Sequence, residues 1–228
     1  MAGQSGQALE AALRTLSPEI YGSMNDPKRI ELKGLEYIMD RLPRGIEQCS
    51  RFVMTDELLQ PLDTSGSPAT LKVQSISIMG KAGILPGKKG DIMLATAHVL
   101  EGPAHNYIVD NDLSREDFDD DSNIYAGPIV TVLGTSLQNR DILDKFQTTS
   151  WKAVGLEMEG GHYQRAINAA IIRGHIPKDV KVRYAYYASD NPLKSVQTLA
   201  AGPMGLEGIR PTYMKTKAII HKILGERQ

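Results

Sequence analysis

The residues with the greatest potential for chemistry are two carboxylates that each follow an apolar segment, Glu159 and Asp190. Glu159 closes the stretch Val-Gly-Leu-Glu-Met-Glu at 154–159 and precedes a run of apolar residues with helical spacing. Asp190 follows residues 180–187, which read as a strand. In a mostly parallel α/β sheet, the carboxyl ends of the strands line the ligand crevice. The sequence therefore predicts a binding or catalytic site that contains both carboxylates.

The same residue types also have purely structural interpretations. Glu157 and Glu159 suit the positive end of a helix dipole and would cap the helix that follows them. Asp190 stands in the sequence Ser-Asp-Asn-Pro at 189–192, which is ordinary turn chemistry. Spacing alone leaves both interpretations open.

A glycine-rich segment, residues 80–90, lies between two apolar segments. We predict a strand over 73–79 that ends at Gly80, then a loop, then a second strand over 91–96. The segment does not match the G-x-G-x-x-G dinucleotide fingerprint, and it lacks both the spacing and the Ser or Thr of a P-loop. Lys81, beside a closely approaching backbone, would still suit a sugar or a phosphate.

Metal catalysis is not indicated by the sequence. Glu159 and His162 have the Glu-x-x-His spacing of di-iron bundles, but such bundles need a second pair and further glutamates. The other histidines lack zinc-ligand spacing, and Cys49 is the single cysteine. We interpret Cys49 as a buried structural thiol in a helical stretch, in keeping with a reducing compartment.

Strand-like and helix-like segments alternate after residue 70, which is typical of α/β proteins. Residues 1–70 differ in texture and are expected to form a divergent, mainly helical N-terminal region, and residues 71–228 an α/β domain. Further predicted elements are a strand at 129–133, helices at 141–146 and 211–224, and an exposed acidic excursion at 112–121.

The composition is that of a soluble globular protein, with 41% hydrophobic and 23% charged residues. Because 26 basic residues nearly balance 27 acidic ones, nothing favours nucleic acid or an anionic membrane as a partner. No apolar run reaches the length of a bilayer span, and the first residues lack the features of a signal peptide. We therefore expect a cytoplasmic protein.

Four segments, in this order along the chain, resemble the nucleoside phosphorylase and nucleosidase superfamily. They are residues 78–85 with 89–92, residues 131–138, residues 155–160 and residues 188–193. The third is similar to the ribose-binding motif of that superfamily, and the fourth is similar to its catalytic Ser-Asp turn. The resemblance covers about residues 71–225 and implies a phosphorylase-like central mixed β-sheet flanked by helices.

The resemblance implies an enzyme that cleaves the N-glycosidic bond of a purine nucleoside or nucleotide, with hydrolysis like that of AMP nucleosidase favoured. This cleavage passes through an oxocarbenium-like sugar. Asp190 would assist the leaving base, and Glu159 would hold the ribose. The other implied roles are ribose binding by Met158 and Glu157, base binding by Leu137, Gln138 and Ser189, and phosphate binding by Gly80 and Lys81. No cofactor or metal is implied, and a homo-oligomer of two or more subunits is expected.

The chain departs from the superfamily pattern before residue 70. Superfamily members normally have a glycine loop there and, in the nucleosidases, a carboxylate that activates water. The residue that would prepare the nucleophile is therefore not identified. Two alternatives follow: a phosphorylase that uses phosphate as co-substrate, and a catalytically weak nucleoside-binding or interaction module.

Overall fold

The computed structural model describes most of the chain after residue 54. The described ranges are 55–64, 67–69, 72–101, 105–119, 121–132, 139–194 and 208–225. The chain divides into two compact units, residues 1–50 and 51–228, and every described residue belongs to the second. The predicted N-terminal helices, Cys49 and the boundary expected at residue 70 lie outside the described residues.

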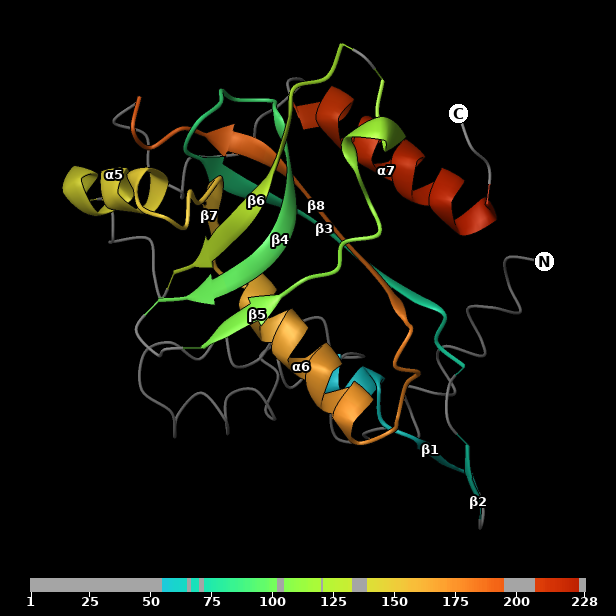
Figure 1. The fold of residues 1–228 in the computed structure, drawn as a ribbon. Helices are drawn as coiled ribbons and strands as arrows, with labels where there is room; N and C mark the ends of the chain where they lie inside the picture. The colour runs from blue at the N-terminus through green and yellow to red at the C-terminus, as the bar shows by residue number, and fades with distance from the viewer. Residues whose placement is uncertain are drawn as a thin grey trace, which may run out of the picture. The chain divides into compact units, whose positions relative to one another are not determined.

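A mixed β-sheet forms the centre of the second unit (Figure 1). Its strands are β3 (Ser75–Ile84), β4 (Ile92–Leu100), β5 (Asn106–Ile108), β6 (Ile124–Thr131), β7 (Gly155–Glu157) and β8 (Lys181–Asp190). The helices around it are the 3-10 helix η1 (Arg115–Asp117), α5 (Arg140–Thr148), α6 (Gly160–Ile172) and α7 (Ile209–Leu224). β1 (Leu62–Thr64) and β2 (Ser67–Ala69) form a separate antiparallel pair. The predicted mixed sheet flanked by helices is confirmed.

The main sheet closes on itself. Its strand order is β5-β4-β6-β7-β3-β8, and β8 also pairs with β4, so β4, β6, β7, β3 and β8 form a ring. β4, β6 and β7 run parallel to one another, whereas β3 is antiparallel to β7 and parallel to β8. The carboxyl ends of the strands therefore lie at both ends of the ring. The pairing register shows which strand ends are neighbours.

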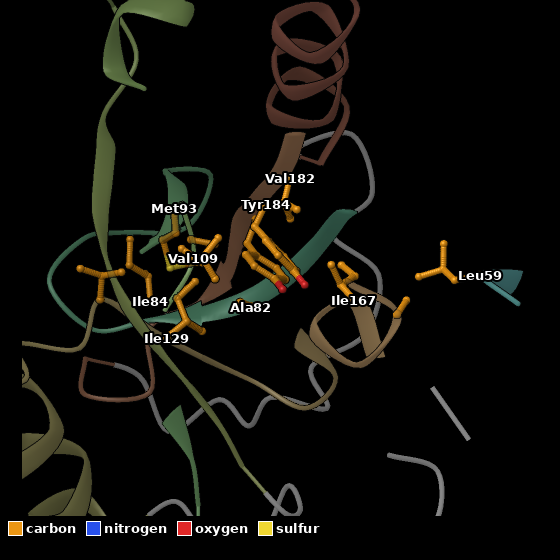
Figure 2. Close-up of a cluster of buried hydrophobic side chains, with 14 of the residues drawn as sticks. Leu59, Ala82, Ile84, Met93, Val109, Ile129, Ile167, Val182 and Tyr184 are labelled. Carbon is orange, nitrogen blue, oxygen red and sulfur yellow. The ribbon is translucent and has the colours of Figure 1, made fainter. Parts of the chain in front are cut away.

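Alternate residues of the strands face two different cores, because successive side chains of a strand point to opposite faces. On β4, Met93 belongs to a cluster that includes Ile167 of α6, and Leu94 belongs to a cluster that includes Met214 of α7. Figure 2 shows the first cluster, where Tyr184 of β8 and Ile167 belong to the same buried group. α6 and α7 therefore cover opposite faces of the strands (Figure 1).

The prediction that Gly80 ends a strand is wrong, because β3 continues through it to Ile84. A Cβ atom at Gly80 would lie 3.0 Å from the ring of Tyr186, which covers this position from β8. The glycine makes room for a neighbouring side chain and does not turn the chain. The turn comes later, at residues 85–90.

The acidic segment at 112–121 is not a detached excursion. Among its described residues, Leu113 and Phe118 are buried against the α7 core. Three of its acidic side chains form ion pairs with α7: Asp117 with Lys222, Asp119 with Lys217 and Asp121 with Arg210. Apolar anchors between the charges hold the segment in place, which charge content alone does not reveal.

Lys215 attaches α7 to β3 from inside the structure. Its side chain is buried, its Nζ donates a hydrogen bond of 2.7 Å to the carbonyl oxygen of Gly80, and the same Nζ lies 4.6 Å from the ring centre of Tyr187. Burial lowers the pKa of Lys215 to about 8. The charged form is disfavoured because desolvation of an ammonium group is costly.

The lowered pKa makes the free energy of unfolding depend on pH. Between pH 8 and 10.5 the unfolded chain binds more protons than the folded one at this site, so the contribution of Lys215 to stability rises with pH. Replacing Lys215 with Met should remove this slope. Relative to the wild type, the variant should lose about 2 kcal/mol of stability between pH 7 and pH 10, measured by urea denaturation.

The control is Lys217→Met, which removes a charge from a partly exposed position of the same helix. If both variants show the same pH dependence relative to the wild type, the slope does not come from burial of Lys215.

Candidate functional site

The first half of the site lies where β7 passes into α6. β7 has only three residues and is held between β6 and β3, and α6 begins at Gly160 directly after Met158 and Glu159. Glu159 is the N-cap residue of α6, but its side chain makes no capping hydrogen bond to the helix. Glu159 is half-buried.

Glu157 is the residue that binds the start of α6. Its carboxylate is buried, and Oε2 accepts hydrogen bonds from the main-chain N–H groups of Glu159, at 2.6 Å, and of Gly160. Oε1 accepts a hydrogen bond from the hydroxyl of Thr131 at the end of β6. Of the two interpretations that the sequence left open, helix capping applies to Glu157.

The pKa of Glu157 reflects this environment. Burial acts to raise it, but the interactions with His98, the Thr131 hydroxyl and the Gly160 N–H outweigh burial and lower the pKa below its usual value. Glu157 is therefore ionised at neutral pH. Through its hydrogen bonds, Glu157 positions the main chain of Glu159 and Gly160.

Two glycines at the start of α6 allow this close approach. A Cβ atom at Gly160 would lie 2.2 Å from Cε1 of His98, and one at Gly161 would lie 2.7 Å from Leu100. Gly161 also donates its N–H to the hydroxyl of Thr131 at 3.0 Å. The pair Gly-Gly is thus required by packing of the helix start on β4.

Asp190 is the last residue of β8 and is 1% exposed. Its Oδ1 accepts a hydrogen bond of 2.6 Å from the hydroxyl of Ser189. Within the part of the chain that the structure describes, Oδ2 has no hydrogen-bond partner. Burial raises the pKa of Asp190, although the Ser189 hydrogen bond and the charges of Lys81 and Lys89 act against burial. A buried carboxyl group with a raised pKa can hold a proton to donate.

The pairing register brings the two predicted motifs together. Gly83 of β3 pairs with Leu156 on one side and with Asp190 on the other, so β7 and the end of β8 flank the same residue. Met158 and Leu193 also pack against the same buried cluster. Residues 155–159 and 188–193, far apart in the chain, therefore meet at one end of the ring.

Asn191 fixes the turn that follows Asp190. Its Nδ2 donates hydrogen bonds to the carbonyl oxygens of Leu85, at 3.0 Å, and Gly87, at 2.8 Å. Its Oδ1 accepts from the N–H groups of Leu193, at 2.9 Å, and Lys194, at 3.2 Å. The buried amide thus joins the turn after β8 to the loop after β3.

The remaining predicted site residues lie in different places. Gly80 and Lys81 lie within β3, and Lys81 is exposed but near enough for its charge to lower the pKa of Asp190. Leu137 and Gln138, predicted to contact the base, lie outside the described residues. Ser189 is buried and bonded to Asp190.

Sequence reasoning missed the side chains that surround Glu157 from other strands. His98 on β4 is fully buried, and its Nδ1 lies 3.5 Å from Oε1 of Glu157. Tyr186 on β8 is also buried, and burial, followed by the charges of Glu157 and Glu159 among others, raises its pKa well above the usual value. No motif marks these residues, because they meet Glu157 only through the sheet.

Two further properties of the described residues bear on the chemistry. No three His, Cys, Asp or Glu side chains gather there into a potential metal site. None of the helices described is both long and apolar enough to cross a membrane.

Comparison with known proteins places the chain in a family. Residues 62–225 match the model of a family of unknown function, DUF6909. The chain belongs to this family. A comparison with curated proteins finds no match.

Solved structures resemble this DUF6909 member in fold. Isoform 2 of uridine phosphorylase from Schistosoma mansoni, in complex with citrate, has a TM-score of 0.52 and 12% identity, covering 77% of this chain and 69% of that chain. Uridine phosphorylase from the same organism, in complex with thymidine, has a TM-score of 0.50 and 15% identity, covering 77% and 67%. AMP nucleosidase from Bacteroides thetaiotaomicron VPI-5482 has a TM-score of 0.45 and 14% identity, covering 79% and 70%. The described fold is therefore similar to that of the two uridine phosphorylases.

The network around Asn191 leads to a prediction about the Asp190 turn. Asn191→Ala should lower the free energy of unfolding by about 2–3 kcal/mol, because it leaves buried carbonyl and N–H groups without their partner. Urea denaturation measures the change. Asn168→Ala serves as the control, since Asn168 is half-buried and accepts one hydrogen bond, from Gln164, and should cost about 1 kcal/mol or less. Equal losses in the two variants would show that the Asn191 bonds are not a special anchor.

Proposed function

We propose that this chain cleaves the N-glycosidic bond of a purine nucleoside or nucleotide, with water as the favoured nucleophile. The observation that supports this most directly is Asp190. It is a buried carboxyl group with a raised pKa, and Oδ2 has no hydrogen-bond partner among the described residues. It pairs with Gly83 of β3, whose other neighbour is β7, the strand that leads to Glu159, on a fold similar to that of a uridine phosphorylase.

The proposed reaction divides the work between the two carboxylates. The bond between the anomeric carbon and the base nitrogen breaks, and its electron pair leaves with the base. Asp190 donates its proton to the departing base, which neutralises the charge that develops there. Glu159 accepts hydrogen bonds from the ribose hydroxyls while positive charge grows on the sugar. Water then bonds to the anomeric carbon and loses a proton to the solvent, and Asp190 takes up a proton from the solvent before the next cycle.

The position of Lys81 supports phosphorolysis as the second candidate function. Its charge acts on Asp190, and it is exposed at the same end of β3. An exposed ammonium group at this place would suit inorganic phosphate or the 5′-phosphate of a nucleotide.

A base-release assay distinguishes the candidates. The protein is incubated with adenosine, inosine, methylthioadenosine, AMP and uridine, each with and without phosphate. Release without phosphate is expected, and release only with phosphate would mean phosphorolysis. Uridine is included because the similar Schistosoma enzymes are uridine phosphorylases. Nucleoside binding without any release would instead support a non-catalytic binding module.

Asp190→Asn tests the proton donor. The amide keeps the shape of the side chain but cannot donate an acidic proton, so base release should fall about 100-fold or more. In the wild type, activity should decline as pH rises through the raised pKa of Asp190, because only the protonated form acts. Ser189→Ala should lose less, since it removes the hydroxyl bonds to Oδ1 and to the carbonyl oxygen of Ala82 but leaves the Asp190 carboxyl group in place. Full activity of Asp190→Asn would contradict the assignment.

Lys81→Ala tests the anion contact. If Lys81 binds phosphate, the KM for AMP, or for phosphate in phosphorolysis, should rise about tenfold, while the KM for adenosine without phosphate stays the same. Lys72→Ala, at an exposed position of the segment before β3, is the matched control. An unchanged KM for AMP and phosphate would rule out this role.

A further inference from the structure

His98 occupies an unusual place for a histidine in the centre of a sheet. It lies on β4, is fully buried, and its ring centre is 4.7 Å from that of Tyr184 and 6.2 Å from that of Tyr186. Neither ring nitrogen has a hydrogen-bond partner of normal length among the described residues. The nearest carboxylate is Glu157, whose Oε1 is 3.5 Å from Nδ1.

The position of His98 relative to α6 gives it a specific contact. Its ring lies directly against the first residue of the helix, since a Cβ atom at Gly160 would fall 2.2 Å from Cε1 and 2.6 Å from Nδ1. The hydroxyl of Tyr186 lies 2.6 Å from the same point. His98 therefore contacts both Glu157 and the main chain that Glu157 binds.

A chain of contacts leads from His98 to the residue expected to hold the sugar. Nδ1 of His98 faces Oε1 of Glu157, and Oε2 of Glu157 accepts the N–H groups of Glu159 and Gly160. The main chain of Glu159 is thus set by a carboxylate that His98 faces from the opposite side. Because buried charges are stable only when they are paired or hydrogen-bonded, each member restricts the others.

We propose that His98 is a positioning residue which, through Glu157, fixes the direction in which the Glu159 carboxylate meets the ribose hydroxyls. This rests on the proposed function. The displacement of a reacting group by about 1 Å can cost on the order of 100-fold in rate, so a residue that sets main-chain position matters without touching the substrate. Glu157 binds the main chain of Glu159 directly, and His98 acts on that main chain through Glu157.

The experiment compares a ribonucleoside with its 2′,3′-dideoxy analogue, which cannot donate hydroxyl hydrogen bonds to Glu159. The measured quantity is kcat/KM for the ribonucleoside divided by kcat/KM for the dideoxy analogue. His98→Phe keeps the ring shape but removes both nitrogens, and the ratio should fall about tenfold. His98→Asn keeps a donor near the position of Nδ1 and should recover much of the ratio. A merely structural loss would lower both activities equally and leave the ratio unchanged.

Met93→Leu is the matched control, because Met93 is fully buried on the same strand and belongs to the cluster that α6 covers. It should leave the ratio unchanged. If His98→Phe does not fold, His98→Gln takes its place, since its amide reaches the position of Nε2 and not that of Nδ1. An unchanged ratio in the variant that lacks the donor, or an equal fall in Met93→Leu, overturns the proposal.

A second measurement separates this proposal from the proposed function. Amide hydrogen exchange at Glu159 and Gly160 reports the hydrogen bonds to Glu157 without any substrate. Exchange at these two amides should be about tenfold faster in His98→Phe or His98→Gln than in Met93→Leu. If the wild type releases no base, the proposed function fails, and faster exchange still supports the link from His98 to the Glu159 main chain. Unchanged exchange overturns that link.

Discussion

The carboxylate of Glu157 is a charge buried away from water, and the groups around it supply the hydrogen bonds that it needs. A buried carboxylate is tolerated only if hydrogen bonds replace the water it has lost. Here the N–H groups at the start of α6 and the hydroxyl of Thr131 provide them. The helix must therefore begin at this point and at this distance from β6. Only glycine fits at positions 160 and 161, because a side chain there would collide with residues of β4.

Closure of the strands into a ring is the second constraint. It places Gly83 between β7 and β8, so two motifs separated by about thirty residues become neighbours. Asn191 then joins the turn after β8 to the loop after β3, and Lys215 ties α7 to Gly80 from the other face. These buried polar side chains fix the turn and the helix to the sheet, which strand pairing alone would not do.

Different environments push the pKa values of Glu157 and Asp190 in opposite directions. Hydrogen bonds keep Glu157 ionised, whereas burial with few compensating bonds raises the pKa of Asp190. Pairs of titratable groups with diverging pKa values are typical of acid–base sites. Glu159 begins α6 without a capping hydrogen bond from its side chain.

The sequence by itself indicated most of the strands and helices after residue 70 but not the short strand β5, and it indicated the helical start after Glu159 and the two acidic motifs, because local periodicity and short-range motifs encode these features. It also misled: Gly80 and the acidic segment at 112–121 have the composition of turns and exposed loops, yet both are packed against side chains from distant strands or helices. Which of the two glutamates, Glu157 or Glu159, caps the helix through its side chain was decided only by the tertiary structure. The reason is physical, since Thr131 of β6 and His98 of β4 reach Glu157 from two other strands, which no sequence spacing relates to it.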